Sequence, residues 1–169
     1  GDRLIVVDEK GQELNGDFIL YILANYFSEK GILKHNTVVS TIMSNKGLYE
    51  SLAEKGINSV KTKVGDRYVL EEMLKNDYNL GGEQSGHIIY LDYSTTGDGL
   101  LTAVQLINIM VDKKSSLSEL ASENKNYPQV LKSVNVKDKN DILNNEKIKN
   151  KIADIENALG ENGRLLIRA

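Results

Sequence analysis

The stretch TVVSTIMSNKGLYESLAEKGINSVKTK, residues 37–63, carries the pattern that decides the fold class. It opens with the β-branched run TVVSTIM, which is typical of a buried strand. Leu48 and Leu52 then lie one helical turn apart, and Gly56 supplies a helix stop. A second strand-like run, INSVKTK, follows at once. The stretch therefore predicts a β-α-β unit, whose two strands run parallel.

The flanking segments continue this alternation of helices and strands. Residues 16–28 are too apolar for a surface helix and predict a mostly buried one, with Asp17 as a candidate N-cap. Further along, the pattern predicts a helix over 65–76 with Asp66 near its cap, a strand over 87–93 and a long buried helix over 96–114. Helices that alternate with strands indicate a layered α/β domain built on a largely parallel mixed sheet.

The composition changes after Lys114 and indicates more than one domain. The next residues hold a polar run and the only proline, which is typical of a linker. The remainder predicts a strand over 129–137, a helix over 144–160 and a strand over 162–169, too little chain to bury a core alone. We expect the end of a preceding domain with the strand-like run RLIVV over 1–10, the α/β domain over 11–114, a linker over 115–128 and a truncated α+β C-terminal domain over 129–169. Both ends of the chain look cut.

Composition and charge argue against several classes of function. The 169 residues are 40% hydrophobic, enough for a globular domain with a buried core. The 21 basic and 24 acidic residues are well mixed along the chain, so we expect neither nucleic acid nor a membrane as a partner. No apolar run approaches the ~20 residues of a membrane span. The chain has no cysteine, so nothing indicates a disulfide framework, and the cytoplasm is the expected compartment.

The segment NLGGEQSGHII, residues 79–89, differs from its amphipathic neighbours and holds one of only two histidines. If residues 82–87 run extended, the period of two places Glu83, Ser85 and His87 on one face. A carboxylate, a hydroxyl and an imidazole together supply acceptors and donors suited to a neutral polyol such as a sugar. The alternative is a glycine-rich turn whose histidine caps the following strand. The residues alone leave both interpretations open.

Several motifs together carry a resemblance to a known family. GGEQSGH, the flanking VGDRYV and the TTGDGLL that follows resemble the third domain of the phosphoglucosamine mutases, in the α-D-phosphohexomutase superfamily. SNKGL and the terminal GDR and GRLLIRA keep the family's order, so the resemblance covers nearly the whole chain. It implies that the loop with Glu83, Ser85 and His87 binds the sugar, and we favour binding over proton transfer for His87.

The resemblance also implies roles for the residues at the two ends. GDR matches the end of the family's metal loop, which implies that Asp2 is one of three aspartate ligands of Mg²⁺. Arg3 would then be a catalytic residue that neutralises phosphoryl charge near the metal. Arg168 matches the arginine of the family's phosphate-binding loop and would clamp the substrate's phosphate. Asp66 and Arg67 either line the cleft or cap a helix.

The activity that the resemblance implies belongs to a longer, four-domain enzyme. Such an enzyme interconverts glucosamine 6-phosphate and glucosamine 1-phosphate through a phosphoserine on its first domain and a bisphosphate intermediate. That serine is expected outside this chain, so we expect the isolated chain to be inactive. Enzymes acting on mannose or glucose phosphates, and a non-catalytic sugar-phosphate binding module, are the alternatives. The expected partner is a small phosphosugar, and the sequence indicates no oligomeric state.

Overall fold

The structure is a computed structural model, and it describes residues 1–136, 138, 142, 144–160 and 163–167. It divides into two compact units, Gly1–Pro128 and Gln129–Ala169. The first unit holds the β-sheet and every candidate site residue except Arg168, which lies outside the described residues.

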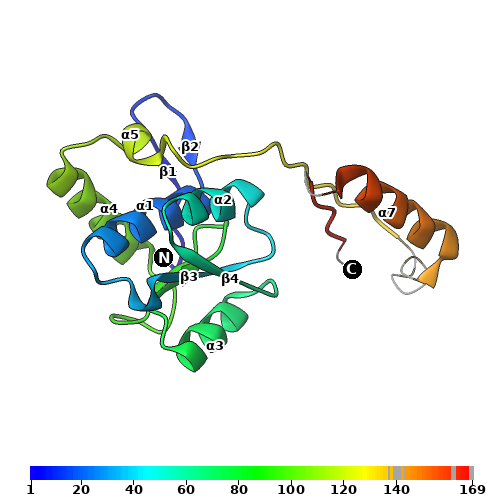
Figure 1. Ribbon diagram of the computed structural model, residues 1–169, viewed down its shortest axis with the longest axis horizontal. Helices are drawn as coiled ribbons and strands as arrows, with labels where there is room; N and C mark the ends of the chain where they lie inside the picture. The colour runs from blue at the N-terminus through cyan, green and yellow to red at the C-terminus, as the bar shows by residue number, and fades with distance from the viewer. Residues whose placement is uncertain (137, 139–141, 143, 161–162, 168–169) are drawn as a thin grey trace. The chain divides into compact units, whose positions relative to one another are not determined.

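A four-stranded sheet forms the centre of the first unit (Figure 1). Its strands lie in the order β4 (Asn58–Thr62), β3 (Thr37–Thr41), β5 (Leu80–Gly82) and β6 (Ile88–Tyr90). β3 pairs in parallel with both β4 and β5, whereas β6 is antiparallel to β5. The predicted layered α/β fold with a largely parallel mixed sheet is therefore confirmed, and the β-α-β unit supplies two of its strands.

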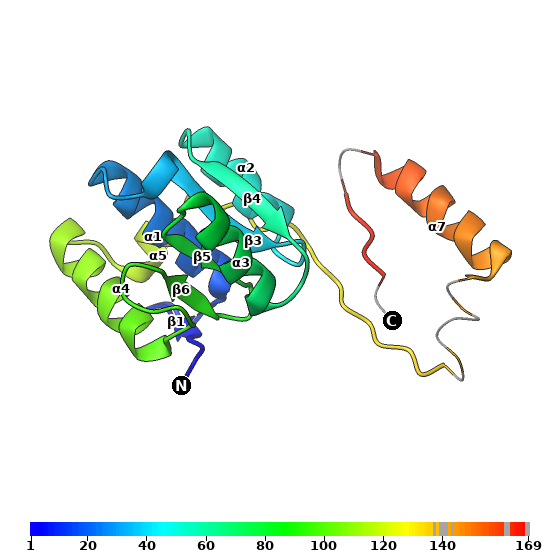
Figure 2. The same cartoon turned by 90° about the horizontal axis from the view of Figure 1, so that it is seen from below.

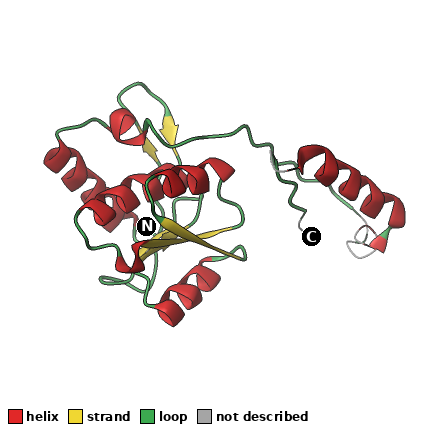
Figure 3. Ribbon diagram, in the orientation of Figure 1, coloured by secondary structure: helices red, strands yellow, loops and turns green. Residues whose placement is uncertain are grey.

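Helices cover both faces of this sheet (Figures 1 and 3). α3 (Asp66–Asn76) lies on one face, and α1 (Gly16–Glu29) and α2 (Lys46–Glu54) lie on the other. Alternation along β3 explains the two layers: Val38 packs in the core around α1, and Val39 packs with Val69 and Met73 of α3. α4 (Gly99–Lys113) and α5 (Leu117–Ala121) pack against α1.

The start of α1 differs from its prediction. Asn15 is the N-cap, because its side-chain oxygen accepts a hydrogen bond from Asp17 N at 3.0 Å. Asp17 as the N-cap is therefore wrong. Its buried carboxylate lies in the first turn, where Oδ2 accepts a hydrogen bond from Asn45 N at 2.7 Å and so joins α1 to the start of α2.

The long helix α4 is only partly buried, against the prediction. Asp98 caps it by accepting a hydrogen bond from Leu101 N at 2.9 Å. One face of the helix is buried against the rest of the first unit, through Thr102, Leu106 and Ile109. The opposite face of the helix is exposed, because no described segment of the first unit covers it.

Short elements precede and follow this fold in the sequence. The predicted amino-terminal strand is present as β1 (Val6–Val7), which pairs antiparallel with β2 (Glu13–Leu14), a strand that the sequence pattern did not predict. Residues 115–127 form α5 and an extended tail whose Tyr127 O accepts a hydrogen bond from Asn45 Nδ2 at 2.8 Å. The domain boundaries at residues 10 and 114 stay predictions.

In the second unit, α7 (Glu146–Leu159) forms where a helix was predicted. Asn145 caps it by accepting a hydrogen bond from Lys147 N at 3.0 Å. Within the described residues 129–136 and 163–167 there is no strand, so the two strand predictions are wrong over those residues. An extended segment needs a paired neighbour to satisfy its backbone hydrogen bonds, and the described part of this unit has none.

Candidate functional site

Residues 83–87 connect β5 to β6 as a tight turn. Glu83 N donates to His87 O at 2.9 Å, and Gly86 N donates to Glu83 O at 3.0 Å. Residues 82–87 are not extended throughout, which was the condition for placing Glu83, Ser85 and His87 on one face; the chain reverses over residues 84–86, as in the alternative of a glycine-rich turn, and Gly86 has a φ of 88°, which favours glycine. The backbones of Glu83 and His87 are nevertheless paired across the turn. Ser85 lies exposed at its tip.

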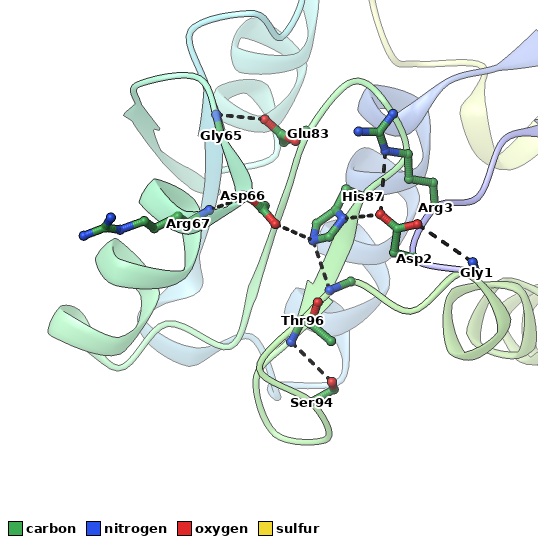
Figure 4. Close-up of polar contacts among 11 residues, drawn as sticks. Gly1, Asp2, Arg3, Gly65, Asp66, Arg67, Glu83, His87, Ser94 and Thr96 are labelled. Carbon is green, nitrogen blue, oxygen red and sulfur yellow. Dashed lines mark hydrogen bonds and ion pairs between the residues drawn. The ribbon is translucent and has the colours of Figure 1, made fainter.

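The carboxylate of Glu83 accepts a hydrogen bond from a neighbouring segment of the chain. Its Oε1 accepts a hydrogen bond from Gly65 N at 3.1 Å, directly before α3 (Figure 4). Gly65 has a φ of 129°, a backbone conformation that residues with a Cβ rarely adopt. The partly buried carboxylate is therefore fixed in direction by a backbone N–H that only glycine can easily supply there.

His87 is buried, and both of its ring nitrogens have partners. Nε2 accepts a hydrogen bond from Gly97 N at 3.0 Å, so the ring carries its proton on Nδ1. Nδ1 lies 3.4 Å from Oδ2 of Asp2 and donates toward that carboxylate (Figure 4). The histidine therefore links the turn to the predicted metal-loop residue.

Close backbone packing brings these segments together. Leu4 N donates to Gly86 O at 3.0 Å, and Gly99 N donates to Gly1 O at 2.8 Å. At Gly97 a Cβ atom would meet the His87 ring and Asp2 O at 2.6–2.7 Å, too close for any side chain. The first residues, the turn and the loop before α4 thus form one packed cluster.

The charged side chains of this cluster are exposed. Hydrogen bonding at the Asp2 backbone, and after it the hydrogen bond from His87, lower the pKa of the Asp2 carboxyl below its usual value. Asp2 therefore remains an anion in weak acid. Nε of Arg3 lies 3.9 Å from Asp2 Oδ2, and both side chains are more than half exposed. The pair therefore presents one negative and one positive charge to solvent.

Asp66 joins the cluster, whereas Arg67 does not. Oδ2 of Asp66 lies 3.8 Å from Nε2 of His87, on the side opposite Asp2 (Figure 4). Nε of Arg67 donates to Glu71 along α3 at 2.7 Å, and its side chain is 82% exposed. Asp66 thus lies beside the turn, and Arg67 forms a surface ion pair.

The sequence-based interpretation missed two glycines and one glutamine of this site. Gly65 and Gly97 bond to Glu83 and His87, and Nε2 of Gln84 donates to Asp17 Oδ2 at 3.1 Å, which anchors the turn to α1. The two glycines stand in the motifs VGDRYV and TTGDGLL, whose glycines were the available signal.

Among the described residues there is no group of three or more His, Asp or Glu side chains that could hold a metal ion. Mg²⁺ requires about six oxygen ligands in near-octahedral geometry. Asp2 alone does not provide such a site, although its exposed anionic carboxylate has the right chemistry for one ligand.

A match to a known protein family identifies the family of this chain. Residues 15–127 match the family described as phosphoglucomutase/phosphomannomutase, alpha/beta/alpha domain III. The chain belongs to the phosphoglucomutase/phosphomannomutase family. Phosphoglucosamine mutase from Anoxybacillus flavithermus is 61% identical to it over 168 residues, which are 99% of this chain and 38% of that protein. This member of the family thus spans about two fifths of the length of that curated relative.

Solved structures show the same fold. A putative phosphomannomutase from Thermus thermophilus has a TM-score of 0.66 and 30% identity, over 72% of this chain and 28% of that one. N-acetylphosphoglucosamine mutase from Aspergillus fumigatus, solved with GlcNAc-6P and magnesium, has a TM-score of 0.58 and 18% identity, over 75% and 32% of the two chains. In the part of this family member that is described, no helix has the length and apolarity needed to cross a membrane.

Proposed function

We propose that this chain is the sugar-binding part of a phosphoglucosamine mutase, which interconverts glucosamine 6-phosphate and glucosamine 1-phosphate. One observation carries the proposal: His87 joins the turn that bears Glu83 to the carboxylate of Asp2. A sugar held at the turn would therefore present its phosphate close to the charged amino-terminal residues. The 61% identity to a phosphoglucosamine mutase supports this substrate over mannose or glucose phosphates.

Glu83 has the chemistry needed to hold the sugar ring. An ionised carboxylate can accept about four hydrogen bonds, and the bond from Gly65 N uses one of these positions. Sugar hydroxyls would donate to the others, and hydrogen bonds to a charged acceptor are about twice as strong as neutral ones. The exposed hydroxyl of Ser85 would donate to, or accept from, a neighbouring hydroxyl of the sugar.

The proposed reaction also explains why the ring would be held by its hydroxyls. A mutase that works through a bisphosphate must accept the sugar in two orientations, so that either phosphate reaches the same reacting group. Hydroxyls near the pseudo-twofold axis of the ring exchange places when it turns over. Glu83 and Ser85 would therefore serve both orientations, while Arg3 and, further along the chain, Arg168 would bind phosphate oxygens.

Mg²⁺ is proposed as the cofactor of the longer protein, as in the complex described for the Aspergillus fumigatus relative. When bound, it would offset charge on the phosphoryl group. Asp2 would supply one oxygen, and the other ligands would come from parts of the longer protein. The role of His87 would be to orient the Asp2 carboxylate through Nδ1–H, as residues that hydrogen-bond to a metal ligand do.

A chimera tests the proposed function. In it, this chain replaces the 168 matched residues of the Anoxybacillus flavithermus protein. We expect the chimera to convert glucosamine 6-phosphate to glucosamine 1-phosphate, and to prefer it to glucose and mannose 6-phosphates. A folded chimera that fails to turn over glucosamine 6-phosphate, beside an active parent protein, would overturn the proposal and favour a non-catalytic module.

A further inference from the structure

α4 carries an apolar stripe on its exposed face. Successive members of the stripe are separated by four, three and four residues, so they share one side of the helix. They are Leu100, Val104, Ile107 and Val111, with exposed fractions of 76%, 47%, 59% and 71%. The opposite face packs in the core through Leu106 and Ile109. A helix that is apolar on both faces is typical of one that is buried on both.

The stripe is too small to hold a separate molecule firmly. A standard protein interface buries about 800 Å² and some 20–30 residues on each partner. Four side chains fall far short of this, so a second copy of the chain would bind weakly through them. A partner joined to the same polypeptide needs much less area, because a short connection raises its effective concentration to about the millimolar range.

Gly1 lies close to one end of the stripe. Gly99 N donates to Gly1 O at 2.8 Å, so the amino terminus lies at the start of α4 (Figure 2), and Leu100 of the stripe follows Gly99 in the sequence. The family match is to domain III and begins at residue 15, so in the family another domain precedes this one. We propose that the stripe is the surface on which the preceding domain of the longer protein docks, through an apolar patch of its own. This inference depends on family membership, not on the proposed substrate.

Cysteine labelling tests this assignment, because the chain has no cysteine of its own. Ile107→Cys reports on the stripe, and Leu74→Cys on α3 is the matched control, since Leu74 is an apolar residue with 58% exposure. Maleimide labelling is followed at each site by peptide mass spectrometry, in the isolated chain and in the chimera. Hydrogen exchange of α4 in both unsubstituted proteins gives the same information without a substitution.

We expect Ile107→Cys to react at least about tenfold more slowly in the chimera than in the isolated chain, with Leu74→Cys unchanged. Amides on the exposed face of α4 should show a parallel slowing of exchange. Equal Ile107→Cys rates in the two folded proteins would overturn the proposal, as would equal slowing at both sites. Concentration-dependent protection in the isolated chain, with a dimer by light scattering, would assign the stripe to a second copy instead.

Discussion

Replacing Glu83 by glutamine in the chimera should damage turnover far more than folding. Glutamine keeps the size of the side chain and one acceptor oxygen, so the hydrogen bond from Gly65 N can persist. That bond changes from charge-assisted to neutral, which should cost the fold about 0.5–1 kcal/mol. The hydrogen bonds from the sugar hydroxyls to residue 83 also lose their charged acceptor. We expect this to cost about 1.5–3 kcal/mol of binding in the transition state, or ten- to a hundredfold in kcat/KM.

The assay is steady-state kinetics in both directions beside a thermal melt. Because one carboxylate would serve both orientations of the sugar, the loss should be similar for glucosamine 6-phosphate and glucosamine 1-phosphate, and bisphosphate should escape more often. Glu71→Gln is the control, since it neutralises another partly exposed carboxylate, one that pairs with Arg67 outside the cluster. A folded Glu83→Gln chimera with near-native kcat/KM would refute sugar binding by this carboxylate.

Gly65→Ala should lower kcat/KM about tenfold and add little once Glu83 is already alanine, whereas Gly56→Ala, at another positive φ with open space around it, should lower only the melting temperature. Hydrogen bonding, chiefly from the Ser118 side chain, lowers the pKa of Glu9 from 4.5 to about 2. The ionised Glu9 carboxylate therefore contributes to stability above pH 4.5, and this contribution is lost as the pH falls toward 2. Over that interval the melting temperature of the wild-type chain should fall more steeply than that of Glu9→Gln. The isolated chain should not turn over glucosamine 6-phosphate in a coupled assay, and measurable turnover would contradict the division of the active site between domains.

The β-α-β unit of the sheet was predictable because its signals are local. The β-branched run at β3, the leucine spacing of α2 and the stop at Gly56 occupy adjacent residues, and each agrees with the next. β5 has only Leu80 and two glycines, which carry no strand signal. It forms because it pairs with both β3 and β6, and because Gly81 lets α3 pack where a Cβ would meet Met73 Sδ at 2.6 Å. Tertiary packing, not propensity, places this strand.

The candidate site was predictable in its residue types but not in its geometry. The motif with Glu83 and His87 indicated polar convergence, yet alternation along an extended strand gave the wrong reason for it. The backbones of the two residues pair across a turn, and His87 reaches Asp2 over a sequence separation that no local pattern can reveal. The N-cap of α1 shows the same limit, since Asn15 and Asp17 are both good caps and a distant contact to Asn45 decides between them.

In the proposed site, the turn bearing Glu83 holds the sugar beside Asp2. A crystal structure of the chimera with glucosamine 6-phosphate would test it most directly. We expect ring hydroxyls within about 2.6–3.2 Å of the Glu83 carboxylate while Gly65 N still donates to it, with the phosphosugar lying next to Asp2 and Arg3. A sugar ring bound away from the turn, with Glu83 bonded to Gly65 alone, would contradict it.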